Sequence, residues 1–256
     1  MSSLIEARVL KQQNICGDTF HLILEAEKPL QSSPGQFARL SLPGILDPFL
    51  PRPFMIFEER GPVLQVVYNV RGKFTGLLSK MRRGAALELH GPLGKPFFLP
   101  EAESYLFVGG GTGAVFFYRY LPYLKRKRCL FLLGSRDSSS AWFPFFFPKE
   151  DTFLITEDGS LGLKGTIPGH FPKIIKRFQP DLILTSGPLS LLKELAFLSS
   201  EQGAPLWVVL EEMMACGVGL CLSCAITVKE GEGERRACLC REGLVWQAKE
   251  VIFSEP

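Results

Sequence analysis

Five of the seven cysteines of this chain lie in the segment 216–240, and their spacing is the first feature that points to chemistry. The segment Cys216–Cys224 places three of them as C-x4-C-x2-C, and Cys238 and Cys240 follow downstream. A clustered trio of thiols with a distant fourth is typical of plant-type [2Fe–2S] sites. Glycines inside the trio permit tight turns, which bring backbone N–H groups toward the sulfur atoms. The spacing therefore predicts an iron–sulfur cluster.

The same cysteines allow a second interpretation, a structural zinc site. Cys221 and Cys224 could join Cys238 and Cys240 in a tetrahedral array, the geometry that zinc prefers. That assignment leaves Cys216 without a role and does not account for the glycines. A disulfide is disfavoured, because thiols stay reduced in the cytoplasm, where we expect this chain to lie. Spacing alone does not choose between Cys238 and Cys240 as the fourth ligand of a cluster.

A second candidate for chemistry is the glycine-rich stretch Gly109–Gly113. It follows the apolar run Tyr105–Val108, which predicts a strand, and it precedes a segment that we expect to be helical through about Lys127. Backbone N–H groups at such a turn can meet the pyrophosphate of a dinucleotide, aided by the N-terminus of the helix. The stretch is not a complete G-x-G-x-x-G fingerprint, so a purely structural turn stays an alternative.

The elements that must position these residues begin with an all-β section, residues 1–100. Short runs rich in strand-forming residues, such as Phe37–Leu42 and Val63–Val70, are separated there by glycine and proline. Closely spaced short strands of this kind predict an N-terminal antiparallel β-barrel.

The next section, residues 101–206, alternates apolar runs with helical patterns such as Leu189–Leu198, which predicts a parallel α/β domain. Residues 207–256 are too few to build a large core, so something else must hold this small C-terminal domain together, and a metal would serve. The predicted fold class is therefore a multi-domain α+β chain. The expected strands are Tyr105–Val108, Cys129–Leu133, Phe153–Thr156, Leu182–Thr185 and Trp207–Leu210.

Composition and charge argue against several classes of protein. Hydrophobic residues make up 46% of the chain and charged residues 21%, as in ordinary globular proteins, and the formal net charge of +3 implies no nucleic-acid partner. No apolar run reaches the roughly 18 residues of a membrane span, and residues 1–11 lack the apolar core of a signal peptide. We therefore expect a cytoplasmic protein without a membrane partner. The histidines, His21, His90 and His170, are isolated, and no catalytic triad is recognisable.

Together these segments resemble the ferredoxin–NADP reductase superfamily and, within it, the electron-transfer subunits of type B dihydroorotate dehydrogenases. The resemblance extends over essentially the whole chain in the same order. Its most specific part is Glu211–Gly219, which is very similar to E-x-R-M-A-C-G-x-G, and Cys240–Trp246 supports it as a form of C-x-D-G-P-V-F. The other similar segments are Arg52–Ile56 (R-P-x-S-I), Tyr68–Thr75 (Y-R-x-x-G-x-G-T), Leu89–Gly94 (the end of the flavin barrel), Val108–Gly113 (V-G-G-G-x-G) and Thr156–Thr166 (T-D-D-G-S-x-G-x-x-G).

The resemblance implies three cofactors, which are FAD, a [2Fe–2S] cluster and NAD. Arg52 is expected to pair with a flavin phosphate oxygen, and Thr75 with neighbouring amides to hold the pyrophosphate. The resemblance selects Cys240 over Cys238 as the fourth cluster ligand, because Cys240 begins the C-terminal motif. NAD versus NADP stays open, although Arg136 could meet a 2′-phosphate. The implied cluster ligands are Cys216, Cys221, Cys224 and Cys240; the implied flavin residues are Arg52, Pro53, Phe54, Met55, Val67, Tyr68, Asn69, Phe74 and Thr75; the implied NAD residues are Gly110, Gly111, Thr112 and Gly113.

The activity that the resemblance implies is electron transfer between NAD and the FMN of a separate catalytic subunit of dihydroorotate dehydrogenase, by way of FAD and the cluster, in pyrimidine biosynthesis. The implied assembly is a heterotetramer with two copies of each subunit. Two alternatives stay open. One is the flavin and iron–sulfur subunit of a hydrogenase or sulfite reductase, which shares this layout, and the other is a zinc-stabilised binding protein without a redox role.

Four residues depart from the motifs of the resembled family, and they affect the expected flavin and nicotinamide contacts more than the cluster. Arg39, in a strand without a motif, is given no role. The departures are Met55 for a serine near the flavin, Asn69 for a basic residue, Phe74 for a glycine of the phosphate turn and Ser186 for a cysteine near the nicotinamide site.

Overall fold

The structure is a computed structural model that describes residues 3–253. Packing divides the chain into two compact units, each described by itself below. The division into three domains at residues 100 and 206 stays a prediction; by packing, the segment after residue 211 contributes to both units. The first unit is Met1–Phe98, Glu212–Ala225 and Cys238–Leu244, and the second unit is Leu99–Glu211, Ile226–Ala237 and Val245–Pro256.

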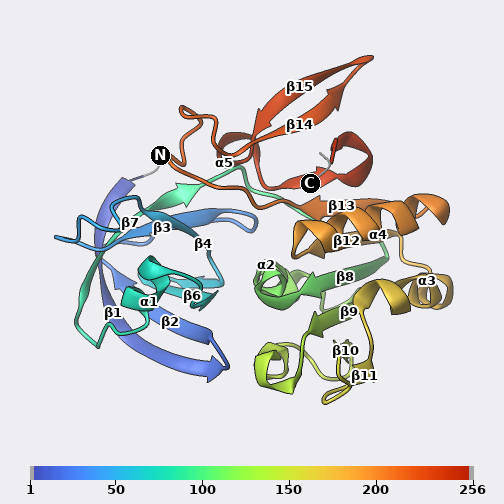
Figure 1. Cartoon of the computed structure of the whole chain (residues 1–256), viewed down its shortest axis with the longest axis horizontal. Helices are drawn as coiled ribbons and strands as arrows, with labels where there is room; N and C mark the ends of the chain where they lie inside the picture. Colours follow the sequence, from blue (N-terminus) through green and yellow to red (C-terminus); the bar gives the residue numbers. More distant parts are fainter. Residues whose placement is uncertain (1–2, 254–256) are drawn as a thin grey trace. The chain divides into compact units, whose positions relative to one another are not determined.

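A seven-stranded antiparallel sheet forms the framework of the first unit. Its elements are β1 (Ser3–Cys16), β2 (Thr19–Ala26), β3 (Phe37–Ser41), β4 (Arg52–Met55), β5 (Glu58–Arg60), β6 (Val63–Asn69) and β7 (Ala86–Leu93), with helix α1 (Lys73–Leu78) after β6. The strand order is β4-β3-β7-β1-β2-β6-β5, so the outermost strands do not pair and the sheet is barrel-like without being closed. β1 and β2 bend along their length (Figure 1), and irregular register near Val9 and Asn14 accounts for bending. The predicted antiparallel barrel section is confirmed.

Alternation of apolar and polar residues decides which face of this sheet is buried. On β1, the side chains of Ile5, Ala7 and Val9 are buried, whereas Glu6 and Arg8 are exposed. A shift of one residue in the pairing would turn the apolar set toward water, so the alternation fixes the register.

The second unit is built on a second seven-stranded sheet. Its strands are β8 (Ser104–Gly110), β9 (Arg128–Ser135), β10 (Thr152–Thr156), β11 (Leu163–Lys164), β12 (Leu182–Ser186), β13 (Leu206–Val209) and β16 (Val245–Gln247). Neighbouring strands are parallel except β16, which pairs antiparallel with β13. All five predicted strands are present, and β11 and β16 are additions that the sequence did not predict. The predicted parallel α/β section is therefore confirmed.

The strand order β11-β10-β9-β8-β12-β13-β16 defines where a ligand would bind. From β8 the chain moves outward through β9 and β10, and it then returns to β12 on the other side of β8. In an open parallel sheet, ligands bind at the carboxyl ends of the strands where the order reverses. The glycine-rich stretch begins in the last two residues of β8, at this switch point.

The helix expected after the glycine-rich stretch is not formed, and the expectation of a helix through Lys127 was wrong. Only α2 (Val115–Tyr118) and short 3-10 turns occupy this segment. Pro122 explains the break, because proline lacks a backbone N–H and its ring clashes with the carbonyl four residues earlier, at Tyr118, where α2 ends. The 3-10 turns of the chain are Gly111–Ala114, Leu121–Tyr123, Ser138–Ser140, Phe143–Phe145 and Ala248–Glu250.

Two longer helices, α3 (Ile167–Phe178) and α4 (Leu189–Glu201), lie beside each other in the second unit (Figure 1). The position of α4 confirms the helix predicted over Leu189–Leu198. The tail adds a hairpin of β14 (Ala225–Glu230) and β15 (Gly233–Cys238), followed by the single turn α5 (Leu239–Glu242). Within residues 3–253, no helix combines the length and apolar character needed to cross a membrane.

Candidate functional site

The cysteine-rich loop of the first unit is shaped by three residues with positive φ. Gly217 has φ +70°, Gly219 has φ +83° and Leu222 has φ +60°. Glycine adopts such backbone angles without steric cost, whereas leucine does so rarely. The loop therefore turns repeatedly over a short length, as a chain that wraps a cofactor must.

The sulfur of Cys216 lies at the centre of the turns. Three backbone N–H groups donate to Cys216 Sγ, from Val218 at 3.5 Å, Leu220 at 3.3 Å and Cys221 at 3.4 Å. Burial opposes ionisation of this thiol, but the three N–H groups together lower the pKa of Cys216. Converging N–H groups stabilise an anion, so the loop favours the thiolate form that binds metals.

Cys221 is the partner of Cys216 in the loop. The N–H of Cys216 donates to Cys221 Sγ at 3.5 Å, and Ser223 Oγ lies 3.1 Å from the same sulfur. These contacts, with the Ser223 hydroxyl first, lower the pKa of Cys221 to about 6. Cys216 and Cys221 thus form one pair of thiols that the loop stabilises as thiolates.

A second pair joins Cys224 to Cys240, which lies in α5. The two side chains are hydrogen-bonded to each other, and both are nearly inaccessible, with 2% and 3% of their surface exposed. Burial, followed by the contact with Cys224, raises the pKa of Cys240 to about 12, while the Gly219 N–H acts in the opposite sense. The Leu239 N–H donates to the Cys224 carbonyl at 3.2 Å, which anchors the start of α5 against the loop.

The arrangement of the thiols in two pairs fits a two-iron cluster, in which each iron takes two cysteine ligands. The described residues contain no group of three His, Cys, Asp or Glu side chains that could share a single metal ion. The zinc interpretation needs Cys238 in a single tetrahedral group, whereas the pairing joins Cys216 with Cys221 and Cys224 with Cys240.

Cys238, at the end of β15, has a different environment from Cys240. Its N–H donates to Glu242 Oε1 at 2.9 Å, and burial raises the pKa of its thiol. The assignment of Cys240 rather than Cys238 as the fourth ligand stays a prediction, and the contact between Cys240 and Cys224 supports it.

The segments expected to bind the flavin come together in the first unit. β4 carries Arg52–Met55, β6 carries Val67–Asn69, and α1 carries Phe74 and Thr75. The ring of Phe54 lies 5.7 Å from that of Tyr68 and 6.0 Å from that of Phe74, measured between centroids. All three rings are buried in the core, so they position the surrounding backbone.

This packing gives a reason for the departure at Phe74. Its side chain points into the core, so its bulk is accommodated where the resembled family has a glycine. Thr75 Oγ1 accepts the N–H groups of Arg71 at 2.9 Å and Gly72 at 3.2 Å, which fixes the turn before α1. A Cβ placed on Gly72 or Gly76 would meet no atom within 4 Å. The turn is thus tightly held and open on its outer side, which suits the close approach of a phosphate.

Arg52 and Asn69 have visible partners in the same region. Arg52 is half-buried, and its Nη1 donates to the Leu50 carbonyl at 2.8 Å, which leaves the rest of its fork of donors for an anion. Asn69 Oδ1 accepts the Thr19 hydroxyl at 2.8 Å. Met55 is half-buried and lies opposite Phe37 of the neighbouring strand β3. A guanidinium with free donors suits a phosphate oxygen of FAD.

Replacement of Arg52 by alanine should weaken FAD binding by about tenfold to a hundredfold, because a charge-assisted contact contributes about 1.5–3 kcal/mol. Arg60→Ala is the matched control, since Arg60 is an exposed arginine of the same sheet that pairs with Glu58. The measurement is the FAD dissociation constant of apoprotein by fluorescence titration. Equal dissociation constants for the two variants would contradict the assignment of Arg52 to the flavin site.

In the second unit, the glycine-rich stretch meets the loop after β12. A Cβ on Gly113 would lie 2.7 Å from the N atom of Gly187 and 2.8 Å from the carbonyl carbon of Ser186. A Cβ on Gly110 would lie 2.8 Å from Leu191 Cδ2, whereas Gly111, with φ +57°, faces open space. The two turns therefore touch at the carboxyl ends of β8 and β12, where the fold predicts a nucleotide.

Two polar residues lie near this switch point. Ser186 ends β12, is 1% exposed, and within residues 3–253 its Oγ has no hydrogen-bond partner. Arg136 is exposed and directly follows β9. The fold brings the residues expected to bind NAD to the carboxyl edge of the sheet, as predicted; they are Gly110, Gly111, Thr112 and Gly113. α2 is too short for a helix dipole to contribute much there.

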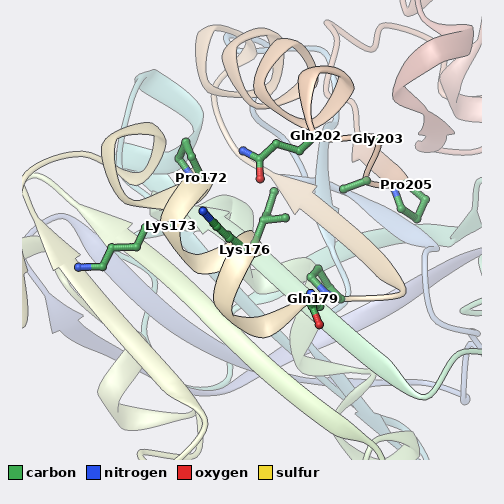
Figure 2. Close-up of a pocket in the computed structure, with 10 residues that line it drawn as sticks. Pro172, Lys173, Lys176, Gln179, Gln202, Gly203 and Pro205 are labelled. Atoms are coloured by element: carbon green, nitrogen blue, oxygen red, sulfur yellow. The ribbon is translucent and has the colours of Figure 1, made fainter.

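A cavity of about 770 Å³ lies at the other edge of the same sheet. Figure 2 shows it between the C-terminal half of α3 and the segments that lead into β12 and β13. Its lining includes Lys173, Lys176, Gln179 and Gln202. Because these segments precede their strands, the cavity is at the amino edge and is separate from the predicted nucleotide site.

Comparison with known proteins gives consistent matches. The iron–sulfur cluster binding domain of dihydroorotate dehydrogenase B matches residues 211–252. The dihydroorotate dehydrogenase B (NAD(+)) electron transfer subunit of Caldanaerobacter subterraneus subsp. tengcongensis is 33% identical over 97% of this chain and 98% of its own length. The corresponding subunit of Desulforamulus reducens is 33% identical over 99% of this chain and 100% of its own length.

The chain belongs to the family of dihydroorotate dehydrogenase B electron transfer subunits. The NADH-dependent reduced ferredoxin–NADP oxidoreductase, studied for flavin-based electron bifurcation, has a chain that superposes with a TM-score of 0.82 at 25% identity, over 96% of this chain and 89% of that one. A ferredoxin NADP+ reductase from Neisseria gonorrhoeae superposes with a TM-score of 0.65 at 16% identity, over 78% and 92%, and shares the fold.

One residue that contacts the cysteine-rich loop was not predicted from the sequence. Arg39, which was given no role, is 6% exposed, and its guanidinium donates to the carbonyls of Ala215 and Cys216. The one feature of the sequence that could have marked Arg39 as functional is its position as a single charged residue inside the apolar run Phe37–Leu42. Sequence did not show what covers that face, because the loop is 176 residues further along the chain.

Proposed function

We propose that this chain passes electrons between NAD and the FMN of a dihydroorotate dehydrogenase catalytic subunit, by way of FAD and a [2Fe–2S] cluster. The observation that carries the proposal is the arrangement of Cys216 with Cys221 and of Cys224 with Cys240, in a chain that also has the flavin and nucleotide folds. Together with the names of the relatives, this arrangement supports an oxidoreductase subunit of pyrimidine biosynthesis.

Each group has residues suited to hold it. The four paired cysteines would ligate the cluster, Arg52 and the Thr75 turn would hold the FAD pyrophosphate, and Gly110–Gly113 would receive NAD. Bound FAD would exchange a hydride with NAD and single electrons with the cluster. The protein contributes fixed positions, and the N–H groups around Cys216 Sγ favour its ionised form.

The partner is proposed from the names of the relatives, which are electron transfer subunits. Beside the cluster loop, Met213 is 78% exposed and Leu220 is 83% exposed, with Val218 and Leu222 also exposed. Exposed apolar side chains of this kind suit a protein interface. We propose that they face the FMN-containing subunit in a cytoplasmic heterotetramer with two copies of each chain, without nucleic acid or membrane.

The histidines of the chain support a conduit without its own organic substrate site. His21 Nε2 pairs with Gln65 Oε1 at 2.7 Å, and His170 Nε2 lies 3.0 Å from the Lys164 carbonyl. His90 lies opposite Arg39 in the sheet. We propose that the electrons leave the chain through the cluster.

The test is formation of NADH from dihydroorotate with each component omitted in turn. Dihydroorotate gives up two electrons and two protons, and NAD+ takes two electrons and one proton. We expect NADH only when this chain, its cluster and the FMN-containing subunit are all present, while the chain alone reduces artificial acceptors with NADH. Full activity from this chain alone, or from the pair with a clusterless variant, would contradict the proposal. A loaded chain that fails to couple would favour a hydrogenase or sulfite reductase partner.

A further inference from the structure

We propose that Arg39 places a fixed positive charge against the cluster loop and thereby raises the reduction potential of the [2Fe–2S] cluster. The inference deepens the proposed function and rests on it, because it requires the cluster to be bound. Arg39 is assigned as a positioning and charge-bearing residue, acting on the cluster through the loop that it contacts.

Strand alternation explains how an arginine is buried at this position. Ala38 and Leu40, its neighbours on β3, belong to the core of the barrel section, so Arg39 points to the opposite face of the sheet. It lies opposite Pro53 of β4 and His90 of β7. The segment Ala215–Gly217 covers this face.

The guanidinium holds the loop by a fork of two hydrogen bonds. Arg39 Nη1 donates to the Cys216 carbonyl, and Nη2 donates to the Ala215 carbonyl. Such a planar fork, which lysine lacks, fixes the direction of the loop entering the first ligand. Arg39 Nε is also buried, and the described residues offer it no acceptor.

The loop packs closely against Arg39 at Gly217. The φ of +70° at this residue favours glycine, and a Cβ added there would lie 2.5 Å from Arg39 Cδ. The residue after the first cluster ligand must therefore be glycine both for its backbone angle and to leave room for the arginine.

The charge of Arg39 lacks a carboxylate partner. The groups acting electrostatically on it include the thiols of Cys216, Cys221 and Cys240, the guanidinium of Arg52 and the imidazole of His90. Residues 3–253 place no Asp or Glu within ion-pair distance of Arg39. A buried cation without an anion is costly, so the site is arranged for negative charge, which ligating thiolates supply.

Reduction changes the charge beside this cation. One-electron reduction, with the electron supplied by the flavin or by a mediator in a titration, leaves one more negative charge on the cluster. A fixed cation in a low-dielectric surrounding stabilises that added charge more than it stabilises the oxidised form. Charge and hydrogen bonds around the sulfur atoms set the potentials of such clusters, so removal of Arg39 should lower the potential.

The experiment compares the variants Arg39→Gln, which loses the charge, and Arg39→Lys, which keeps the charge but not the fork. Arg60→Gln is the control, because it removes the charge of an exposed arginine from the same sheet. Each full-length chain is loaded with FAD and cluster, and the reduction potential of the cluster is measured by electron paramagnetic resonance during a mediated titration. Iron and acid-labile sulfide give the cluster content.

We expect Arg39→Gln to shift the one-electron equilibrium by about tenfold toward the oxidised form, which corresponds to a potential lower by about 59 mV. Arg39→Lys and Arg60→Gln should stay close to the wild-type potential. Loss of the cluster in Arg39→Gln, with a loaded Arg39→Lys at the wild-type potential, would also support the role of charge.

Three outcomes would overturn the inference and leave the proposed function standing. These are an unchanged potential in Arg39→Gln, an equal shift in both Arg39 variants, and loss of the cluster in both, which would assign Arg39 a purely geometric role. A wild-type chain that cannot be loaded with a [2Fe–2S] cluster would overturn the proposed function together with the inference.

Discussion

Cys240→Ser should lose its [2Fe–2S] cluster almost completely, whereas Cys238→Ser should keep it. Cys240 is hydrogen-bonded to Cys224 and approaches the Gly219 N–H, so its loss would leave one iron with a single cysteine ligand. Removal of a residue that merely supports a ligand lowers metal affinity by about 10- to 100-fold, and removal of a ligand should cost more. The measurement is iron and acid-labile sulfide per chain, together with the visible absorbance of the cluster.

Cys238→Ser is the matched control, because it makes the same chemical change two residues away. The FAD content of both variants should stay close to that of the wild type, since the flavin residues belong to other segments. Retention of the cluster in Cys240→Ser, with its loss in Cys238→Ser, would reverse the assignment of the fourth ligand. Tetrahedral zinc with no iron in the native protein would contradict the two-iron arrangement altogether.

Gly113→Ala should reduce NADH-dependent reduction of an artificial acceptor by about a hundredfold. The added methyl group would lie 2.7 to 2.8 Å from backbone atoms of Ser186 and Gly187, which cannot move aside as a side chain does. The turns after β8 and β12 must then separate, and displacements of this scale at a binding site cost about 10²-fold in rate. Overpacking should also destabilise the fold by about 1–3 kcal/mol.

Gly169→Ala is the control for this substitution. Gly169 lies in the first turn of α3, and its added Cβ would make only an ordinary contact with Thr166 Oγ1 at 3.5 Å. Alanine favours helices, so this variant should keep its activity and unfold at the wild-type temperature or slightly above it. Steady-state kinetics with NADH and thermal unfolding of both variants provide the comparison. Wild-type kinetics in Gly113→Ala would show that the contact between the two turns does not shape the nucleotide site.

The fold was largely predictable because its signals are local. Continuous apolar runs such as Tyr105–Val108 mark strands that are buried on both faces, and these runs became the centre of the parallel sheet. The helix expected through Lys127 failed for a local reason as well, since Pro122 stops it after Tyr118. β16 could not be predicted, because a three-residue strand at the edge of a sheet carries little pattern of its own.

The cysteine spacing by itself favoured an iron–sulfur centre over zinc. The trio within Cys216–Cys224 has a spacing that few other sites use, and its glycines have the backbone angles that such a loop needs. The likeness of the Cys240 segment to a family motif added the fourth ligand as a prediction. Sequence could do this because the three clustered ligands lie in one short loop, where spacing controls geometry.

Only the tertiary structure decided which residues act on that centre from elsewhere in the chain. Arg39 looked like any solvated strand arginine, and its burial depends on the loop 176 residues later that covers its face of the sheet. The inward turn of Phe74 and the contact of Gly113 with Gly187 are likewise set by packing partners distant in sequence. Sequence patterns report the period of a strand or a helix, whereas the identity of the neighbour across a sheet face is fixed only when the chain has folded.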